Sequence, residues 1–263
     1  MKKREERKYF DKEWKDMKAS LESYLKKERQ EDLHHFRVQV KKLRAFLILS
    51  DSTEQHPKLT QHFKPVRMIF KQAGEIRSAY INLELGKTHQ IDNGIFMSDQ
   101  HQLQLNASSK FKSNGTKNLE KLKDSHQLLK EKIKPVSDLH INLFYRKQLH
   151  QIADTLTKPK FDDQLHTCRK QVKILIYNHK LTHSALGTGV NTDYLDLVQI
   201  AIGDWHDHVL AIELFSSNEA KDQAAVSSLK KQDTKFKNHI TNLTKDFYNR
   251  ASTVVELPVE QLS

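Results

Sequence analysis

The chain has 263 residues, with 7 glycines, 5 prolines and a single cysteine. So few turn-forming residues argue against a many-stranded sandwich or barrel, and one cysteine excludes an intrachain disulfide and a cysteine-rich zinc site. Lys and Arg number 44 against 33 Asp and Glu, a net charge of +11. This surplus favours an anionic partner, such as nucleic acid, anionic lipid or a phosphate polymer, without choosing among them.

Helical spacing of apolar residues extends over most of the chain. In the first segment Phe10, Trp14, Met17 and Leu21 follow one another at steps of three or four residues. The same spacing predicts helices, in chain order, over 3–27, 31–49, 65–85, 117–134, 136–156, 161–181, 192–215 and 220–249.

Breaks between the predicted helices fall at 51–57, 158–159 and 182–191, where proline, glycine and polar residues gather. The stretch 86–115 has the weakest pattern and is predicted to be a linker. The tail 252–263 has no amphipathic continuation and is predicted to be loosely held.

The chain opens with MKKREERKYF, which lacks the apolar segment of a secretion signal. Its longest uncharged apolar run, 45–49, is far too short to span a bilayer. Hydrophobic residues make up 37% and charged residues 29%, which suits helices with one buried face rather than a disordered chain. We therefore expect a soluble, cytoplasmic protein that does not enter a membrane.

Two pairs of segments repeat along the chain. Residues 33–43, LHHFRVQVKKL, align with 165–175, LHTCRKQVKIL, and at a similar distance 74–78, GEIRS, align with 203–207, GDWHD. Recurrence of both motif and spacing predicts a duplication. We expect an all-α fold of two pseudo-twofold-related helical bundles, with half-repeats of about 1–110 and 117–250 in a single domain of 1–263.

The repeated segment carries a basic row beside its apolar stripe. At about 100° per residue, His34, Arg37, Lys41 and Arg44 share a stripe about 80° wide, and the second copy repeats it. Neither 33–49 nor 165–181 contains Asp or Glu. Arg offers a fork and Lys a mobile charge to phosphate oxygens, so such a row suits a chain of phosphates. The alternative is that these cations are solvated or pair with carboxylates inside the bundle; recurrence in the same register favours binding.

These residues resemble the CHAD domain, the conserved histidine α-helical domain. Its hallmark, His-x-x-Arg-x-x-x-Lys/Arg-Lys/Arg-x-Arg, is met by His34, Arg37, Lys41, Lys42 and Arg44. The second copy is met by His166, Arg169, Lys170, Lys173 and Tyr177, with Ile176 where the family usually has Arg. The Gly-Glu-x-Arg-Asp signature is present as Gly74, Glu75 and Arg77, with Ser78 replacing the acid, and Gly203, Asp204 and Asp207 resemble the Gly-Asp-x-x-Asp element.

The resemblance covers about 10–250, and it implies a standalone all-α domain of two bundles. Its basic helices would line a central groove or pore that binds inorganic polyphosphate without catalysis, cofactor or metal. The site residues that it implies are His34, Arg37, Lys41, Lys42, Arg44, Arg77, His166, Arg169, Lys170 and Lys173. It also implies a cytoplasmic location in association with polyphosphate granules, and the departures at Ile176 and Ser78 are expected to lower the affinity.

Two other functions remain open at this point. His206 and Asp207 are similar to the His-Asp pair of metal-dependent HD phosphohydrolases, and Asp204 and His208 lie within one helical turn of them; we expect these residues to orient Arg or Lys instead. Nonspecific nucleic-acid binding ranks below polyphosphate, because exposed aromatic residues do not interleave with the basic rows. Cys168 falls in the apolar stripe, so we expect a packed thiol rather than a nucleophile.

Overall fold

The computed structural model describes residues 3–53, 58–89, 94–187, 189–217 and 222–253. Within these ranges the chain is almost entirely helical, and its only strands are β1, Gly189–Val190, and β2, Ser252–Thr253. The two strands pair antiparallel, with Gly189 opposite Thr253. The predicted all-α class is therefore confirmed.

The described residues of the first half form six helices, and each helix that was predicted there begins and ends close to its predicted bounds. They are α1 (Lys3–Lys27), α2 (Gln30–Asp51), α3 (Leu59–His62), α4 (Lys64–Thr88), α5 (Gly94–Ser113) and α6 (Gly115–Lys132). Their apolar faces form one cluster that includes Phe10, Trp14, Phe36 and Val66. Trp14 is thus a core residue, as its place in the apolar stripe predicts.

The part of the second half that the structure describes forms five helices and one short 3-10 turn, η1 (His183–Ala185). The helices are α7 (Asp138–Thr157), α8 (Asp163–Thr182), α9 (Thr192–Ser216), α10 (Gln223–Leu243) and α11 (Phe247–Ala251). Their apolar faces form a second cluster around Ile152, Cys168, Val198 and Trp205. The predicted helix over 220–249 is interrupted after Leu243, where Asp246 takes a left-handed backbone conformation with φ of 55°.

The boundary between the two packed clusters lies near residue 134. Leu122, Leu129 and Ile133, at the end of the first half, pack with α1–α5, whereas Val136 belongs to the second cluster. The predicted half-repeats of about 1–110 and 117–250 concern the duplication in the sequence, and they stay a prediction. The twofold relation between the half-repeats stays a prediction.

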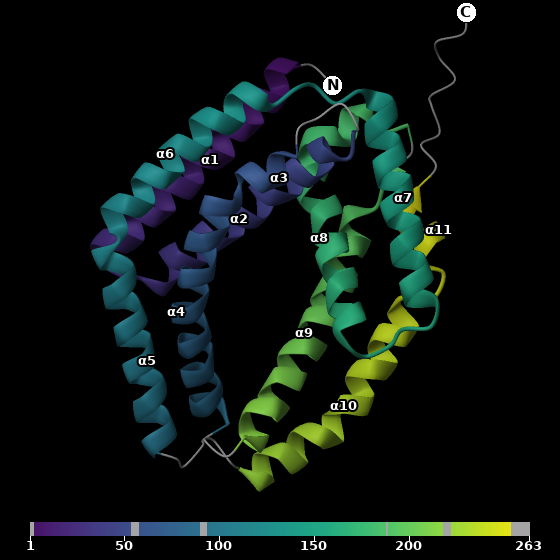
Figure 1. The fold of residues 1–263 in the computed structure, drawn as a ribbon. Coiled ribbons are helices and arrows are strands. Elements are labelled where there is room, and N and C mark those ends of the chain that lie inside the picture. The colour runs from purple at the N-terminus through teal and green to yellow at the C-terminus, as the bar shows by residue number, and fades with distance from the viewer. Residues whose placement is uncertain (1–2, 54–57, 90–93, 188, 218–221, 254–263) are drawn as a thin grey trace, which may run out of the picture.

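The two halves meet at two separate places, so that the chain forms two arms joined at both ends (Figure 1). At one junction α2 packs on α8, and the buried Asn178 amide donates a hydrogen bond of 3.0 Å to the Ala45 carbonyl. At the other, a third cluster joins Phe96 of α5 to Phe215 of α9 and Leu229 of α10.

The predicted linker over 86–115 is wrong, because α4 continues to Thr88 and α5 begins at Gly94. The buried side of α5 carries Gln100 and Ser108 as well as Phe96 and Phe111. Ser108 shares a hydrogen bond of 2.9 Å with the Tyr24 hydroxyl. Polar residues at buried positions hide the helical pattern in the sequence.

Most of the tail over which loose attachment is expected, 254–263, lies outside the described residues. Ser252 and Thr253, which precede it, are held by β1. Among the described helices, none combines the length and the apolarity needed to cross a bilayer.

Candidate anion-binding site

The apolar stripes of α2 and α8 place their basic rows at the edge of the core. Leu33, Phe36, Val40 and Leu43 of α2 are buried, as are Leu165, Cys168, Val172 and Leu175 at the matching positions of α8. Because the stripes are buried, the basic stripe next to each of them is held beside the neighbouring helix. The Asp162 side chain caps α8 by accepting the Gln164 N–H at 2.8 Å.

Arg37 is anchored across the first half. Its Nη1 donates to the Phe70 carbonyl of α4 at 2.9 Å, and the guanidinium lies 4.2 Å from the centre of the Phe70 ring. A Cβ atom on Gly74 would lie 2.8 Å from Nη1. The glycine of the first GEIRS motif therefore leaves room for the arginine to cross α4.

Arg169 is anchored in the same way across the second half. Its Nε donates to the Gln199 carbonyl of α9 at 2.9 Å, and a Cβ atom on Gly203 would lie 2.7 Å from Nη2. In both halves the acceptor carbonyl belongs to the residue four positions before the glycine. In each half, the repeated glycine thus makes room for the repeated arginine to reach its acceptor carbonyl.

Lys41 brings the two basic rows together. Its side chain is exposed, yet desolvation by the surrounding protein lowers its pKa to about 8, with further lowering by Arg37, Lys173 and Arg169. Asp207 is a weaker, opposing neighbour. The lysine of α2 and the cations of α8 therefore form one cluster, which we call the central cluster: Arg37, Lys41, Arg169 and Lys173.

Lys173 is more constrained than Lys41. Its ammonium donates to the Gln199 side-chain oxygen at 3.2 Å and lies 5.4 Å from the centre of the Tyr177 ring. Desolvation and the neighbouring Arg169 lower its pKa. Part of its hydrogen-bonding capacity is therefore used inside the protein.

The two histidines begin the rows but differ in their surroundings. His34 is exposed, and desolvation followed by Arg77 lowers its pKa. His166 is half-buried, with its ring 4.0 Å from that of His206, and desolvation followed by His206 lowers its pKa to about 4. His166 Nδ1 is buried and has no hydrogen-bond partner among the described residues.

The other predicted site residues lie around the central cluster or away from it. Arg77 stacks on Tyr80 at 4.8 Å and lies close enough to lower the pKa of Arg37. Lys170 is exposed, and its positive charge helps to lower the pKa of His166. Lys42 instead points to α1, where its ammonium lies 3.6 Å from the Glu13 carboxylate.

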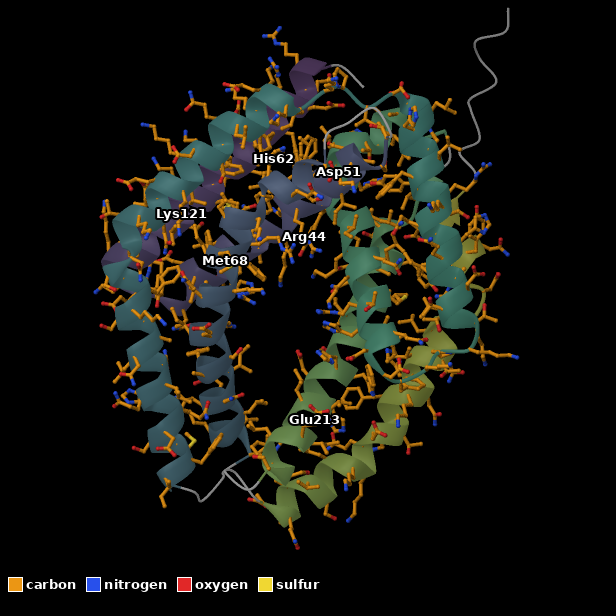
Figure 2. All side chains as sticks on the ribbon, in the orientation of Figure 1. Arg44, Asp51, His62, Met68, Lys121 and Glu213 are labelled. Atoms are coloured by element: carbon orange, nitrogen blue, oxygen red, sulfur yellow. The ribbon has the colours of Figure 1, made fainter. Side chains whose placement is uncertain are left out.

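Arg44 turns toward α4 rather than α8. Desolvation and then Arg67 of α4 lower its pKa, and Figure 2 shows Arg44 on the side of α2 that faces the space between the two arms. Arg67 belongs to a basic face with Lys64 and Lys71 that was not among the predicted site residues. Their spacing of three and four residues, from the residue before the predicted helix over 65–85 into its second turn, was the available signal.

The residues of the alternative metal site do not converge. Asp204 and Asp207 are exposed, whereas His208 is buried with its ring 4.7 Å from that of Phe236 on α10. Among the described residues, no group of three or more His, Cys, Asp or Glu is placed to hold a metal ion. Burial raises the pKa of Cys168 to about 12, so the prediction of a packed thiol is confirmed.

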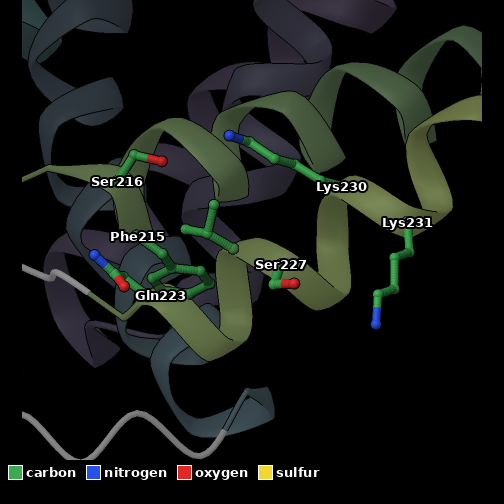
Figure 3. Close-up of a pocket in the computed structure, with 7 residues that line it drawn as sticks. Phe215, Ser216, Gln223, Ser227, Lys230 and Lys231 are labelled. Atoms are coloured by element: carbon green, nitrogen blue, oxygen red, sulfur yellow. The ribbon is translucent and has the colours of Figure 1, made fainter.

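A pocket of about 620 Å³ opens where α9 meets α10, near the second junction of the arms (Figure 3). Phe215 lies on its wall, together with the exposed Lys230 and Lys231. None of the predicted site residues lines it.

Comparison with known proteins supports the resemblance. The CHAD domain family model matches residues 98–216, which include the second basic row and Gly203 but not the first row. A crystal structure of the CHAD domain from the plant Ricinus communis is similar in fold, with a TM-score of 0.63 and 16% identity, covering 93% of this chain and 91% of that one. No curated protein is significantly similar in sequence. Residues 98–216 therefore match the CHAD domain family, and the fold of almost the whole chain is similar to that of a CHAD domain.

Proposed function

We propose that the central cluster binds inorganic polyphosphate and leaves it intact. The observation that carries this proposal is the packing of α2 on α8, which brings Lys41 within electrostatic reach of Arg169 and Lys173 from the opposite half of the chain. Cations that lower one another's pKa repel, and a bound anion removes that repulsion.

The arrangement suits a linear polymer of phosphates. Arg37, Lys41 and Arg44 stand on successive turns of α2, which rise by about 5.4 Å each, so the row offers one cation per turn. Arg37 and Arg169 are held by carbonyl groups, and each guanidinium has further N–H groups to donate. Donors that are oriented before binding lose less entropy when the anion arrives.

Nucleic acid fits this row less well. Base stacking needs exposed aromatic rings among the cations. Phe70 instead lies under the Arg37 guanidinium, and Tyr177 lies beside the Lys173 ammonium. We therefore expect recognition of phosphate charge, with no contribution from bases.

A competition titration tests this proposal. Labelled long-chain polyphosphate bound to the protein is titrated with single-stranded RNA at equal charge concentration, and released phosphate is measured in parallel, with and without divalent metal. We expect RNA to displace the polymer only in large excess, and no release of phosphate. Displacement at equal charge would favour nucleic acid, and metal-dependent release abolished by Asp207→Ala would favour a hydrolase.

A further inference from the structure

A basic cavity lies on the first half alone, where it is lined by residues of α2, α3 and α4. It has a volume of about 560 Å³ and lies between α2 and α4, with α3 at its end. Its lining residues are Arg44, Ile48, Thr60, Gln61, Lys64, Arg67, Met68 and Lys71. Figure 2 labels Arg44 and Met68, which stand on its two walls. We call this the α2–α4 cavity.

Its four cations are exposed, and none of them has a partner among the residues that the structure describes. Among the described residues, the side chains of Arg44, Lys64, Arg67 and Lys71 make no hydrogen bond or ion pair, and no carboxylate lines the cavity. The neighbouring Asp51 carboxylate already accepts the Leu59 and Thr60 N–H groups at 2.6 and 2.9 Å, and the Thr60 hydroxyl. Four positive charges that no described side chain pairs with therefore face one cavity.

The cavity and the central cluster share the basic row of α2. Arg44 lines it and belongs to the same row of α2 as Arg37 and Lys41. Lys71 of its other wall follows Phe70, whose carbonyl holds Arg37. An anion that leaves the central cluster along α2 therefore meets the cavity within one or two helical turns.

The second half lacks the equivalent cations. The anchoring pairs, Arg37 with Gly74 and Arg169 with Gly203, set the register between the halves. In that register Arg44 corresponds to Ile176, and Lys64, Arg67 and Lys71 correspond to Asp193, Asp196 and Ile200. Two carboxylates and two apolar side chains replace four cations. The corresponding surface of the second half would therefore repel a phosphate chain.

We infer that the α2–α4 cavity is a second phosphate subsite, through which a bound polyphosphate chain leaves the central cluster over the first half only. This inference rests on the proposed function, because the same polymer occupies both places. The subsite makes the bound chain extend over the first half and not over the second. Chains long enough to reach the cavity therefore bind more tightly than short ones.

A chain-length series with a triple variant tests the subsite. Lys64→Gln/Arg67→Gln/Lys71→Gln removes three cations of the cavity, and Lys117→Gln/Lys121→Gln/Lys123→Gln removes the same charge from the outer helix α6, where Figure 2 shows Lys121. We expect the cavity variant to lose the affinity gain of long polyphosphate over tripolyphosphate. Its slope of log affinity against log salt should become shallower by about 2, from three lost contacts at about 0.7 each. The α6 variant should keep the gain and most of the slope.

The outcomes separate the two proposals. If wild type binds no polyphosphate, both fail. If Lys41→Glu weakens binding but the cavity variant keeps the chain-length gain and the slope, the subsite is overturned and the proposed function stands. If the cavity variant behaves like the α6 variant, general charge accounts for binding and the subsite is likewise overturned. Circular dichroism on each variant shows whether the fold is kept.

Discussion

The two halves of the molecule share an anchor but differ in charge. In both, an arginine crosses the next long helix beside a glycine and donates to the carbonyl four residues earlier. Around that anchor the first half adds Arg44 and the α4 cations, whereas the second places Ile176, Asp193 and Asp196 at the matching positions. The anchor is a packing requirement, whereas the surrounding charges are free to vary because they are exposed.

The same contrast separates Lys41 from Lys173. Lys41 makes no hydrogen bond or ion pair to a described residue. The Lys173 ammonium, in contrast, donates a hydrogen bond to Gln199 and lies over the Tyr177 ring. An incoming phosphate therefore meets an unoccupied ammonium on the first half and a partly occupied one on the second.

Charge reversal at these two lysines has the largest expected effect. Lys41→Glu should weaken polyphosphate binding about 100-fold and Lys173→Glu about 10-fold, since one lost charge-assisted hydrogen bond costs about 1.5–3 kcal/mol. The control is Lys235→Glu, at an exposed lysine on α10. Calorimetric titration at one salt concentration measures all three, and equal losses in all three would contradict the central cluster.

Restoring the missing arginine should strengthen binding. Ile176→Arg adds a cation to α8 at the position of Arg44, and we expect affinity to rise about 5- to 10-fold through one added charge-assisted contact. Ile176→Gln controls for the loss of the half-buried apolar side chain. If both variants bind equally, the second half does not contact the polymer at this turn.

The titration of Lys41 makes binding sensitive to alkaline pH. Its pKa of about 8 in the free protein means that the ammonium loses its charge as pH rises through that value. Affinity for polyphosphate should therefore fall several-fold between about pH 7 and about pH 9. Lys41→Arg keeps its charge throughout and should flatten this profile, whereas an unchanged profile in Lys41→Arg would assign the effect to another group.

The two glycines should differ in their tolerance of alanine. A Cβ on Gly203 would meet three atoms of the Arg169 guanidinium within 2.9 Å, whereas on Gly74 it would meet only Nη1 of Arg37 that closely. Losing the Arg169 hydrogen bond costs more than the helix propensity gained, so Gly203→Ala should lower the free energy of unfolding by about 1–2 kcal/mol.

Gly74→Ala should cost less than about 1 kcal/mol, since only one terminal nitrogen has to turn. Gly94→Ala, where a Cβ meets nothing within 4 Å, is the control. Urea denaturation measures all three glycine variants. A larger loss in Gly74→Ala than in Gly203→Ala would contradict the difference between the halves.

The last prediction concerns His166. Its folded pKa of about 4 lies below the unfolded value of about 6.5, so the unfolded chain binds the extra proton first. The free energy of unfolding should therefore fall as pH decreases from about 6.5 toward about 4, and His166→Gln should lose part of that dependence. Polyphosphate stabilises the protonated ring, so its affinity should rise over the same range; parallel pH profiles for wild type and His166→Gln would contradict both.

The sequence by itself determined most of the helices and the basic rows. Strict apolar spacing marks α1 and α2, and their bounds agree within one or two residues of prediction. Neither 33–49 nor 165–181 contains Asp or Glu. This absence identified the helices whose cations have no anionic partner on the same helix segment. Local periodicity carries this information because a helix aligns side chains by spacing alone.

Only the tertiary structure decided which helices are neighbours and what the glycines do. α5 escaped prediction because its buried side carries Gln100 and Ser108, whose partners lie on other helices. In the sequence, Gly74 and Gly203 are recognisable only as parts of a motif; the structure shows that Arg37 and Arg169 pack against them. Lys42 also belongs to the motif, but its ammonium lies near Glu13. Pairing between helices far apart in the chain depends on how their faces pack. It cannot be predicted from the spacing of residues within one helix.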